Sequence, residues 1–207
     1  MFLWHYLAQG KLRDRKSSDT EFQILKLDIY SVGVGKPVVY DWGTSGIRKH
    51  PVDGALAIFE TGCEGDGQAD LKSHGGPDKA ACCYPLEHYP YWLERLGKRI
   101  WAHSFGENLS LKGATEDDIC VGDIFECGQL ILQVSQPRRP CWKLARLHDR
   151  KEIVLWAQDT GKTGWYTRVL QPGVAVAGAR LQLSERLFPN WTISRANTLI
   201  YSKNPNP

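Results

Sequence analysis

DIFECGQLILQVS, residues 123–135, reads as two apolar arms joined at Cys127-Gly128. Glycine adopts the backbone conformations that tight turns require, so the chain can reverse at this dipeptide. The second arm, residues 130–134, is rich in apolar and β-branched side chains, as strands are. We therefore expect a β-hairpin here, whose second strand delivers the chain to the residues that follow.

Those following residues hold a cysteine in a stiff, basic setting. Residues 134–143 read VSQPRRPCWK, and the two prolines fix φ and lack N–H donors, which favours a loop over a helix or a central strand. Four cations lie within a few residues of Cys141: Arg138, Arg139, Lys143 and Arg146. Cations favour the thiolate, which can act as a nucleophile or bind a metal. The alternative is a small core cysteine beside a solvated basic loop, and the residues alone leave both open.

Short strands recur on both sides of this stretch. Apolar, β-branched or aromatic strands are predicted at residues 22–32, 38–42, 55–59 and 164–170. Short helices are predicted at residues 85–96, 150–158 and 191–201. This pattern predicts a β-rich α+β fold, a barrel or sandwich with a few short helices.

We expect three parts along the 207 residues. Residues 1–21 include the polar run GKLRDRKSSDT and should form a loose N-terminal arm. Residues 22–187 are long enough to form one barrel-like domain with its own core. Residues 188–207 should form a short C-terminal helical remnant, because NPNP at 204–207 ends the last helix almost at once.

Composition narrows the class of protein. The net charge of +3 is too small to suggest nucleic-acid binding. The N-terminal order of apolar and basic residues is the reverse of a secretory signal, and no apolar run is long enough for a membrane helix. Six cysteines include no CxxC pair, so we expect reduced thiols in the cytoplasm rather than disulfides or structural zinc.

A glycine-dense polar segment, residues 62–79, ends in HGGPDK. Glycines let backbone amides approach an anion, which suits a phosphate cradle. The segment matches neither GxGxxG nor the P-loop, and turns are the commoner use of such loops. His74, taken alone, is more typical of a hydrogen-bonded structural histidine than of a ligand.

Six segments occur in an order that resembles one known family: GDGQADLKSHGGPDKA (65–80), YPLEHYPYW (84–92), FGENL (105–109), GDIF (122–125), VSQPRRPCWKL (134–144) and GWYTRVLQPG (164–173). Together they resemble a MOSC domain over roughly residues 28–185. The resemblance is greatest to the stand-alone branch associated with bacterial resistance to 6-N-hydroxylaminopurine. It implies a MOSC-type β-barrel-like fold.

The resemblance also implies a molybdenum cofactor in its molybdopterin form. Cys141 would be the metal ligand and the catalytic residue. Phosphate and pterin groups need hydrogen-bond donors and positive charge. Matching motif positions place cofactor contacts at Lys49, His74, Gly75, Gly76, Glu107, Asn108 and Arg138. We add Arg168, which could instead pair with a surface carboxylate.

The implied activity is reduction of small N-hydroxylated compounds (hydroxylaminopurines, hydroxylamines, amidoximes) to amines. No nicotinamide or flavin motif is visible, so a separate reductase should supply the electrons. The alternative is a carrier that holds cofactor or persulfide on Cys141 without turnover. Cys63 and Cys82-Cys83 depart from the family pattern, and relatives often continue into a helical domain beyond the segment at 191–197. If that appendage docks an electron donor or forms a dimer, its role is either lost or taken by another protein, and the oligomeric state stays open.

Overall fold

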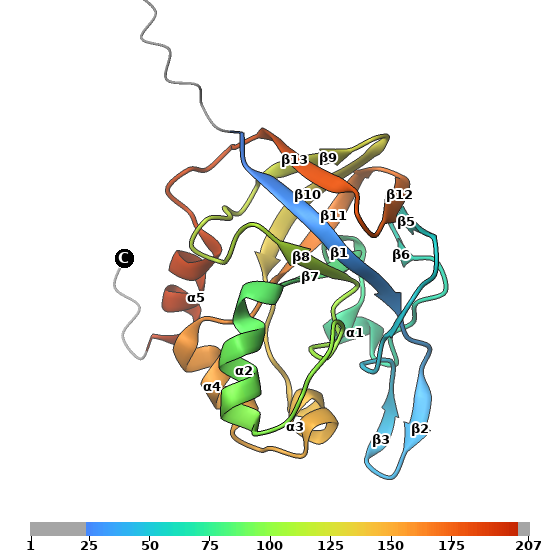
Figure 1. Ribbon diagram of the computed structural model, residues 1–207, viewed down its shortest axis with the longest axis vertical. Helices are drawn as coiled ribbons and strands as arrows, with labels where there is room; N and C mark the ends of the chain where they lie inside the picture. The colour runs from blue at the N-terminus through green and yellow to red at the C-terminus, as the bar shows by residue number, and fades with distance from the viewer. Residues whose placement is uncertain (1–23, 203–207) are drawn as a thin grey trace, which may run out of the picture.

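The computed structural model describes residues 24–202, so the arm expected at residues 1–21 lies outside the described residues. Seven strands form a closed barrel (Figure 1): β1 (Lys26–Val34), β7 (Ala81–Pro85), β8 (Leu109–Lys112), β9 (Ile124–Cys127), β10 (Leu130–Pro137), β11 (Trp165–Gln171) and β13 (Arg180–Glu185). Shorter strands lie around it: β2 (Val38–Tyr40), β3 (Gly43–Ser45), β4 (His50–Pro51), β5 (Ala55–Phe59), β6 (Gly62–Cys63) and β12 (Gly173–Val176). The α-helices are α1 (Leu71–His74), α2 (Tyr89–Leu96), α3 (Trp142–His148), α4 (Ile153–Thr160) and α5 (Ile193–Tyr201), and the 3-10 helices are η1 (Pro77–Lys79) and η2 (Leu86–His88). The predicted β-rich α+β barrel with a few short helices is confirmed.

The barrel closes between its first and last strands. Around the ring the order is β13-β9-β10-β11-β7-β8-β1, and β1 then pairs with β13. Leu27 and Leu181 face each other across this closure and are 1% and 2% exposed. Closure gives every strand of the ring two neighbours, so the ring presents no free strand edge. The apolar residues that point inward form one continuous core.

The hairpin predicted from residues 123–135 is confirmed, because β9 pairs with β10 across a turn in which Gly128 has a φ of 59°. The prediction of a loop at Pro137 is wrong, since β10 extends through Pro137, which pairs with Trp165 of β11. A proline is tolerated here because it is the last residue of the strand. The next residue, Arg138, donates its N–H to the Gly164 carbonyl at 3.0 Å and so continues the pairing.

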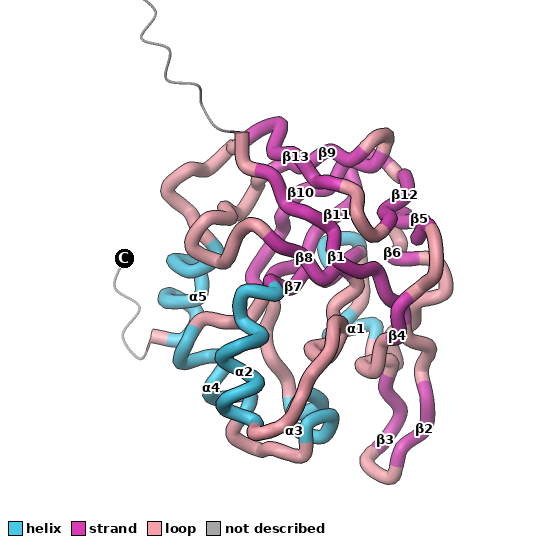
Figure 2. Tube along the Cα trace, viewed as in Figure 1, coloured by secondary structure: helices cyan, strands magenta, loops and turns pink. Residues whose placement is uncertain are grey.

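A second core lies between the barrel and the helices, which gather below the strands in Figure 2. Tyr84 stacks on Phe105 with ring centroids 4.4 Å apart, and the Trp92 indole donates to the Tyr84 hydroxyl at 2.6 Å. Leu144 of α3 and Ile153 of α4 belong to the same cluster. This packing holds α3, and therefore the residue that precedes it, against the end of the barrel.

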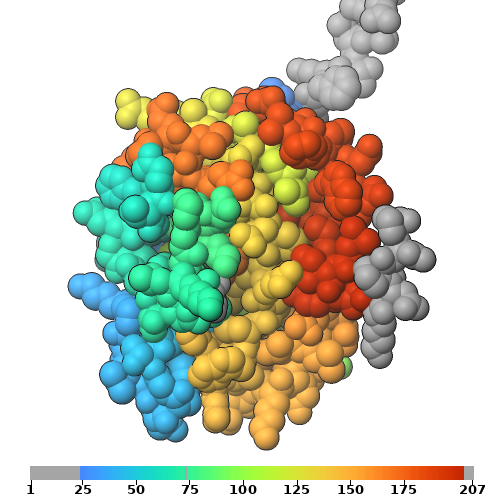
Figure 3. All heavy atoms as spheres, turned by 180° about the vertical axis from the view of Figure 1, so that it is seen from behind, coloured from blue at the N-terminus to red at the C-terminus, as the bar shows by residue number. Residues whose placement is uncertain are grey.

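The C-terminal helix α5 packs beside α4 and β10, and its red atoms adjoin the yellow and orange segments in Figure 3. The Ile193 amide donates to the Ile119 carbonyl at 2.8 Å, and the Thr192 hydroxyl caps the helix by accepting from the Arg195 amide. The boundary placed at residue 187 stays a prediction. Among the helices of residues 24–202, none has the length and apolar character needed to cross a membrane.

Leu181→Ala should lower the free energy of unfolding by about 2–5 kcal/mol, because it leaves a cavity at the barrel closure. Gln182→Ala, at the exposed neighbouring position of β13, should change it by less than about 0.5 kcal/mol. Urea unfolding of both variants tests this. Equal losses in the two variants would contradict the inward direction of Leu181.

Candidate functional site

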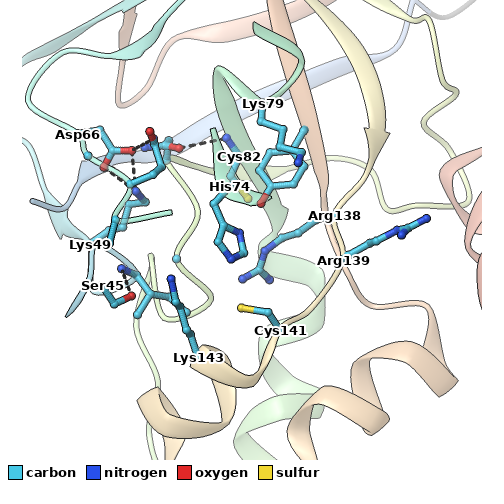
Figure 4. A pocket seen from close by; sticks show the side chains of 18 residues that line it. Ser45, Lys49, Asp66, His74, Lys79, Cys82, Arg138, Arg139, Cys141 and Lys143 are labelled. Atoms are coloured by element: carbon cyan, nitrogen blue, oxygen red, sulfur yellow. Dashed lines mark hydrogen bonds and ion pairs between the residues drawn. The ribbon is translucent and has the colours of Figure 1, made fainter. Parts of the chain in front are cut away.

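A cavity opens at the end of the barrel, where β10 delivers Arg138 and Cys141 (Figure 4). Its walls come from the segments 45–49, 66–69 and 138–143, together with His74, Lys79, Cys82, Gly106, Asn108 and Tyr166. A groove continues from it between the β2–β3 hairpin and the start of α3. Trp42 and Trp142 line this groove, and their rings pack edge to face with centroids 5.6 Å apart.

Cys141 is partly buried and directly precedes α3. Burial by itself raises the pKa of its thiol. A hydrogen bond with His74, the charge of Arg138 and a hydrogen bond with the Lys143 backbone outweigh burial and lower the pKa to about 7. The side chains of His74 and Arg138 point toward the sulfur, and the Lys143 side chain extends into the same cavity (Figure 4). Cys141 is therefore substantially thiolate at neutral pH, as the cationic sequence around it predicts.

Arg138 supplies a positive charge in a fixed position. The residue is 6% exposed, and its guanidinium donates to the Phe105 carbonyl. Its backbone is held by Gly164 at the end of the β10–β11 pairing. A buried cation needs hydrogen bonds and an anion nearby, and the Cys141 thiolate provides the anion.

Lys49 also lies in the cavity wall, but its charge is paired within the protein. Its Nζ lies 2.5 Å from Oδ1 of Asp66, which also accepts from the Gly35 amide at 2.8 Å. Asp66 is the one carboxylate among the described residues that line this cavity. Four further cations line it: Lys79, Arg138, Arg139 and Lys143. The cavity therefore carries an excess of positive charge and suits an anionic ligand.

Asn108 reaches the cavity wall while its side chain ties strands together. Its Oδ1 accepts from the Cys82 amide and its Nδ2 donates to the Gly33 carbonyl, each at 3.1 Å. Both ends of this amide are satisfied by the protein. The structure thus brings five of the sequence-predicted residues to one cavity: Lys49, His74, Asn108, Arg138 and Cys141.

The other predicted residues lie outside the described cavity lining. Gly75 and Gly76 follow His74 and lead into η1, where Gly76 has a φ of 100°. Arg168 is half-exposed and pairs with Asp78 at 2.8 Å, which is the surface alternative considered for it. These placements leave their roles toward a cofactor as predictions.

Glu107 is fully buried beneath the cavity and organises the loop around it. Its carboxylate accepts from the amides of His103 and Phe105 at 2.7 and 3.0 Å. It also accepts from the hydroxyls of Tyr89 and Ser110 at 2.7 and 2.8 Å. All four donors belong to the protein, so this carboxylate holds loop residues rather than facing the cavity.

Several cavity residues were not among the predicted contacts. They include Ser45, Gly46, Ile47, Asp66, Gln68, Lys79, Cys82, Arg139, Lys143 and Tyr166. Lys143 and Arg139 had a signal in the sequence, because they flank Cys141 and entered the charge argument for the thiolate. Residues 45–47 carried no such signal in the sequence, because only the folding of the β2–β3 hairpin brings them to the cavity.

The remaining five cysteines have no lowered pKa. Burial raises the pKa to about 12 for Cys63, to about 11 for Cys82, and well above its ordinary value for Cys83. Burial also raises the pKa of Cys120 and of Cys127. Cys82 therefore lines the cavity as a neutral thiol.

The donor set fits a metal that brings its own organic ligands. Within residues 24–202, no cluster of three or more His, Cys, Asp or Glu side chains is arranged to hold a metal ion. Cys141 offers one thiolate, and the surrounding cations suit phosphate. A pterin cofactor that carries both a metal and a phosphate matches this combination.

Comparisons with known proteins show which family and which proteins this chain is similar to. The MOSC domain family model matches residues 70–182. The uncharacterized protein YflK of Bacillus subtilis is 44% identical over 180 residues, which cover 85% of this chain and 81% of YflK. A protein of Gibberella moniliformis named reductase is 33% identical over 165 residues, which are 78% of this chain and 29% of that protein. The crystal structure of YiiM from Geobacillus stearothermophilus is 42% identical and aligns over 84% of each chain with a TM-score of 0.73.

The closed barrel places a thiolate in a cationic cavity, and this combination suits an anionic ligand that carries a metal. The chain belongs to the MOSC domain family. Domains of this family are associated with the molybdenum cofactor, and membership of the family supports an oxidoreductase-like function related to this cofactor.

Alkylation of Cys141 by iodoacetamide should follow a titration midpoint near pH 7, because the thiolate is the reacting form. His74→Ala should move this midpoint upward, since it removes a hydrogen bond to the thiolate. His50→Ala, which changes an exposed histidine, should leave it in place. Mass spectrometry of the Cys141 peptide across pH gives the rates. A midpoint of about 9 in the unaltered protein would contradict the lowered pKa.

Glu107→Ala should lower the stability of the cofactor-free protein by at least about 3 kcal/mol, because four buried donors lose their acceptor and each costs roughly 1–3 kcal/mol. Glu94→Ala, at an exposed position of α2, is the control and should change it little. Urea unfolding measures both. Unchanged stability in Glu107→Ala would favour the cofactor-contact role that the family motif suggested.

Proposed function

We propose that this protein binds the molybdenum cofactor at Cys141 and reduces N-hydroxylated compounds to amines with electrons from a separate reductase. One observation carries the proposal. Among the six cysteines, all within the described part of the chain, Cys141 alone combines a lowered pKa with a place in the cationic cavity. A thiolate beside fixed positive charge is what an anionic, metal-bearing cofactor requires.

The protein's own residues would divide the work of holding this cofactor. Cys141 offers the thiolate ligand, and His74 orients the sulfur through its hydrogen bond. Arg138 and Lys143 supply positive charge for the phosphate, while the paired Lys49 and Asp66 shape the wall opposite. When bound, the cofactor supplies the redox-active metal.

The substrate would approach along the groove that joins the cavity at Cys141. Trp42 and Trp142 flank this groove and can shield the reacting N–O group from bulk water. The net reaction takes R–NHOH, two electrons and two protons to R–NH2 and water, so the N–O bond breaks and an N–H bond forms. The Gibberella moniliformis relative named reductase supports a reductive role.

The test uses protein produced in a molybdenum-replete host that makes the cofactor. Molybdenum and pterin are measured separately, and reduction of benzamidoxime is followed with dithionite as the electron source. Cys141→Ala should lose the activity and the metal, whereas Cys127→Ala should keep both. Full activity in Cys141→Ala would overturn the proposal. Unaltered protein that holds molybdenum and pterin but does not reduce benzamidoxime would establish the carrier alternative instead.

Arg138 and Arg168 form a matched pair for the cofactor-binding step, because both were predicted contacts and Arg138 alone lines the cavity. Arg138→Lys retains the charge but loses the planar fork, and Arg138→Ala loses both. A hydrogen bond to a charged group contributes roughly 1.5–3 kcal/mol, so Arg138→Ala should weaken cofactor affinity about ten- to a hundredfold. Arg168→Ala should change it less than about twofold.

Titration of apo-protein with free molybdopterin measures these affinities, and unfolding curves confirm that each variant folds. An equal loss in Arg138→Ala and Arg168→Ala would contradict the distinction between cavity and surface.

A further inference from the structure

A basic surface lies at the far end of α3 from Cys141. Six exposed cations occupy two segments around the ends of α2 and α3: Arg95, Lys98, Arg99, Arg146, Arg150 and Lys151. The same segments hold three exposed carboxylates: Glu94, Asp149 and Glu152. Three positive charges are therefore in excess, and the ion pairs found among residues 24–202 include none of the six cations.

The two segments form one continuous surface. Lys98 donates to the His148 carbonyl at 2.7 Å, and the His148 ring lies 2.7 Å from the Ser104 carbonyl. The lower ends of α2 and α3 lie near each other in Figure 1. Burial lowers the pKa of His148 to about 4, so this histidine adds no charge at neutral pH. We call the surface of residues 94–101 and 146–152 the α2–α3 face.

The α2–α3 face also presents an exposed aromatic ring. Trp101 is 61% exposed, and the Arg99 guanidinium lies 4.1 Å from its ring centroid. Tryptophan and arginine are the residues that most often dominate binding energy at protein interfaces. Unpaired charge of one sign around such a residue steers a partner of opposite charge.

We propose that the α2–α3 face docks the electron donor, and that the donor is a small acidic protein carrying an iron–sulfur cluster or a flavin. This inference rests on the proposed function, which requires an external donor. The helix α3 starts directly after Cys141 and ends at this face. Seven helical residues span about 10 Å, so a donor seated there lies one short helix from the thiolate.

The electron balance is complete with this donor. The donor is oxidised by two electrons in total, and the N-hydroxy group takes them up with two protons from water, releasing the amine and one water. A cluster protein that carries one electron docks twice in each turnover. A fully reduced flavin protein supplies both electrons.

Charge reversal on the face tests the proposal with the cofactor-loaded full chain. Arg150→Glu/Lys151→Glu changes two exposed cations of the face that do not line the cavity. The control, Lys26→Glu/Lys112→Glu, makes the same charge change near the start of β1, at the opposite end of the molecule from α3 (Figure 1). Each protein is assayed with dithionite, with a reduced acidic [2Fe–2S] ferredoxin and with a reduced acidic flavodoxin.

The face variant should show at least a tenfold higher KM for a protein donor at low salt, with its dithionite-driven rate within twofold of the unaltered protein. The difference should shrink as salt rises, because exposed charges are screened. The control variant should behave like the unaltered protein. Calorimetric titration with the oxidised ferredoxin and flavodoxin should show the same loss of affinity without any turnover.

The outcomes separate the two proposals. No reduction with dithionite would refute the proposed function, and the calorimetric titration would still decide whether the face binds an acidic protein. Normal dithionite activity with unchanged donor KM and donor affinity in the face variant would overturn the docking proposal. Loss of binding to DNA or to anionic lipid vesicles, with donor kinetics unchanged, would assign the face to another partner and overturn it too.

Discussion

The buried guanidinium of Arg138 is the constraint on which the site depends. A cation with 6% exposure is costly unless hydrogen bonds and an anion compensate it. The Phe105 carbonyl accepts one bond, and the Cys141 thiolate provides negative charge. The stabilisation is mutual, because the negative charge of the thiolate compensates the buried Arg138, and the positive charge of Arg138 helps to lower the pKa of Cys141. The barrel strand β10 ends one residue before Arg138 and holds it in place.

Behind Arg138, the buried carboxylate of Glu107 positions the carbonyl group that accepts a hydrogen bond from the guanidinium. Glu107 takes up the amides of His103 and Phe105, which bends the loop so that the Phe105 carbonyl faces the guanidinium. His103 sits in the left-handed region with a φ of 70°, a strained conformation that this network can maintain. The site is thus built in layers, with a structural carboxylate below, a fixed cation above it, and the thiolate at the cavity surface.

Local patterns in the sequence were enough to predict the β9–β10 hairpin and the lowered pKa of Cys141, since turn chemistry and nearby charge act within a few residues. The alternation of residues in the sequence also indicated that Arg168 points outward, which its charge alone does not show. Trp165, Thr167 and Val169 point inward along β11, so Arg168 between them must point outward. The strand β7 gave no alternation, because all five of its residues are buried. Both Glu107 and Asn108 hold other parts of the protein, but only Asn108 reaches the cavity wall. This difference depends on long-range contacts, which adjacent residues in a sequence do not reveal.

The proposed cofactor site and the proposed docking face place positive charge at the two ends of α3. At its start, Arg138 and Lys143 act at short range in a partly buried cavity, where solvent ions screen weakly. At its end, Arg146, Arg150 and Lys151 are exposed, so their attraction reaches further into solvent and depends strongly on salt. Cofactor retention and donor association should therefore respond differently to ionic strength. One seven-residue helix joins these two basic environments, although the net charge of the whole chain is only +3.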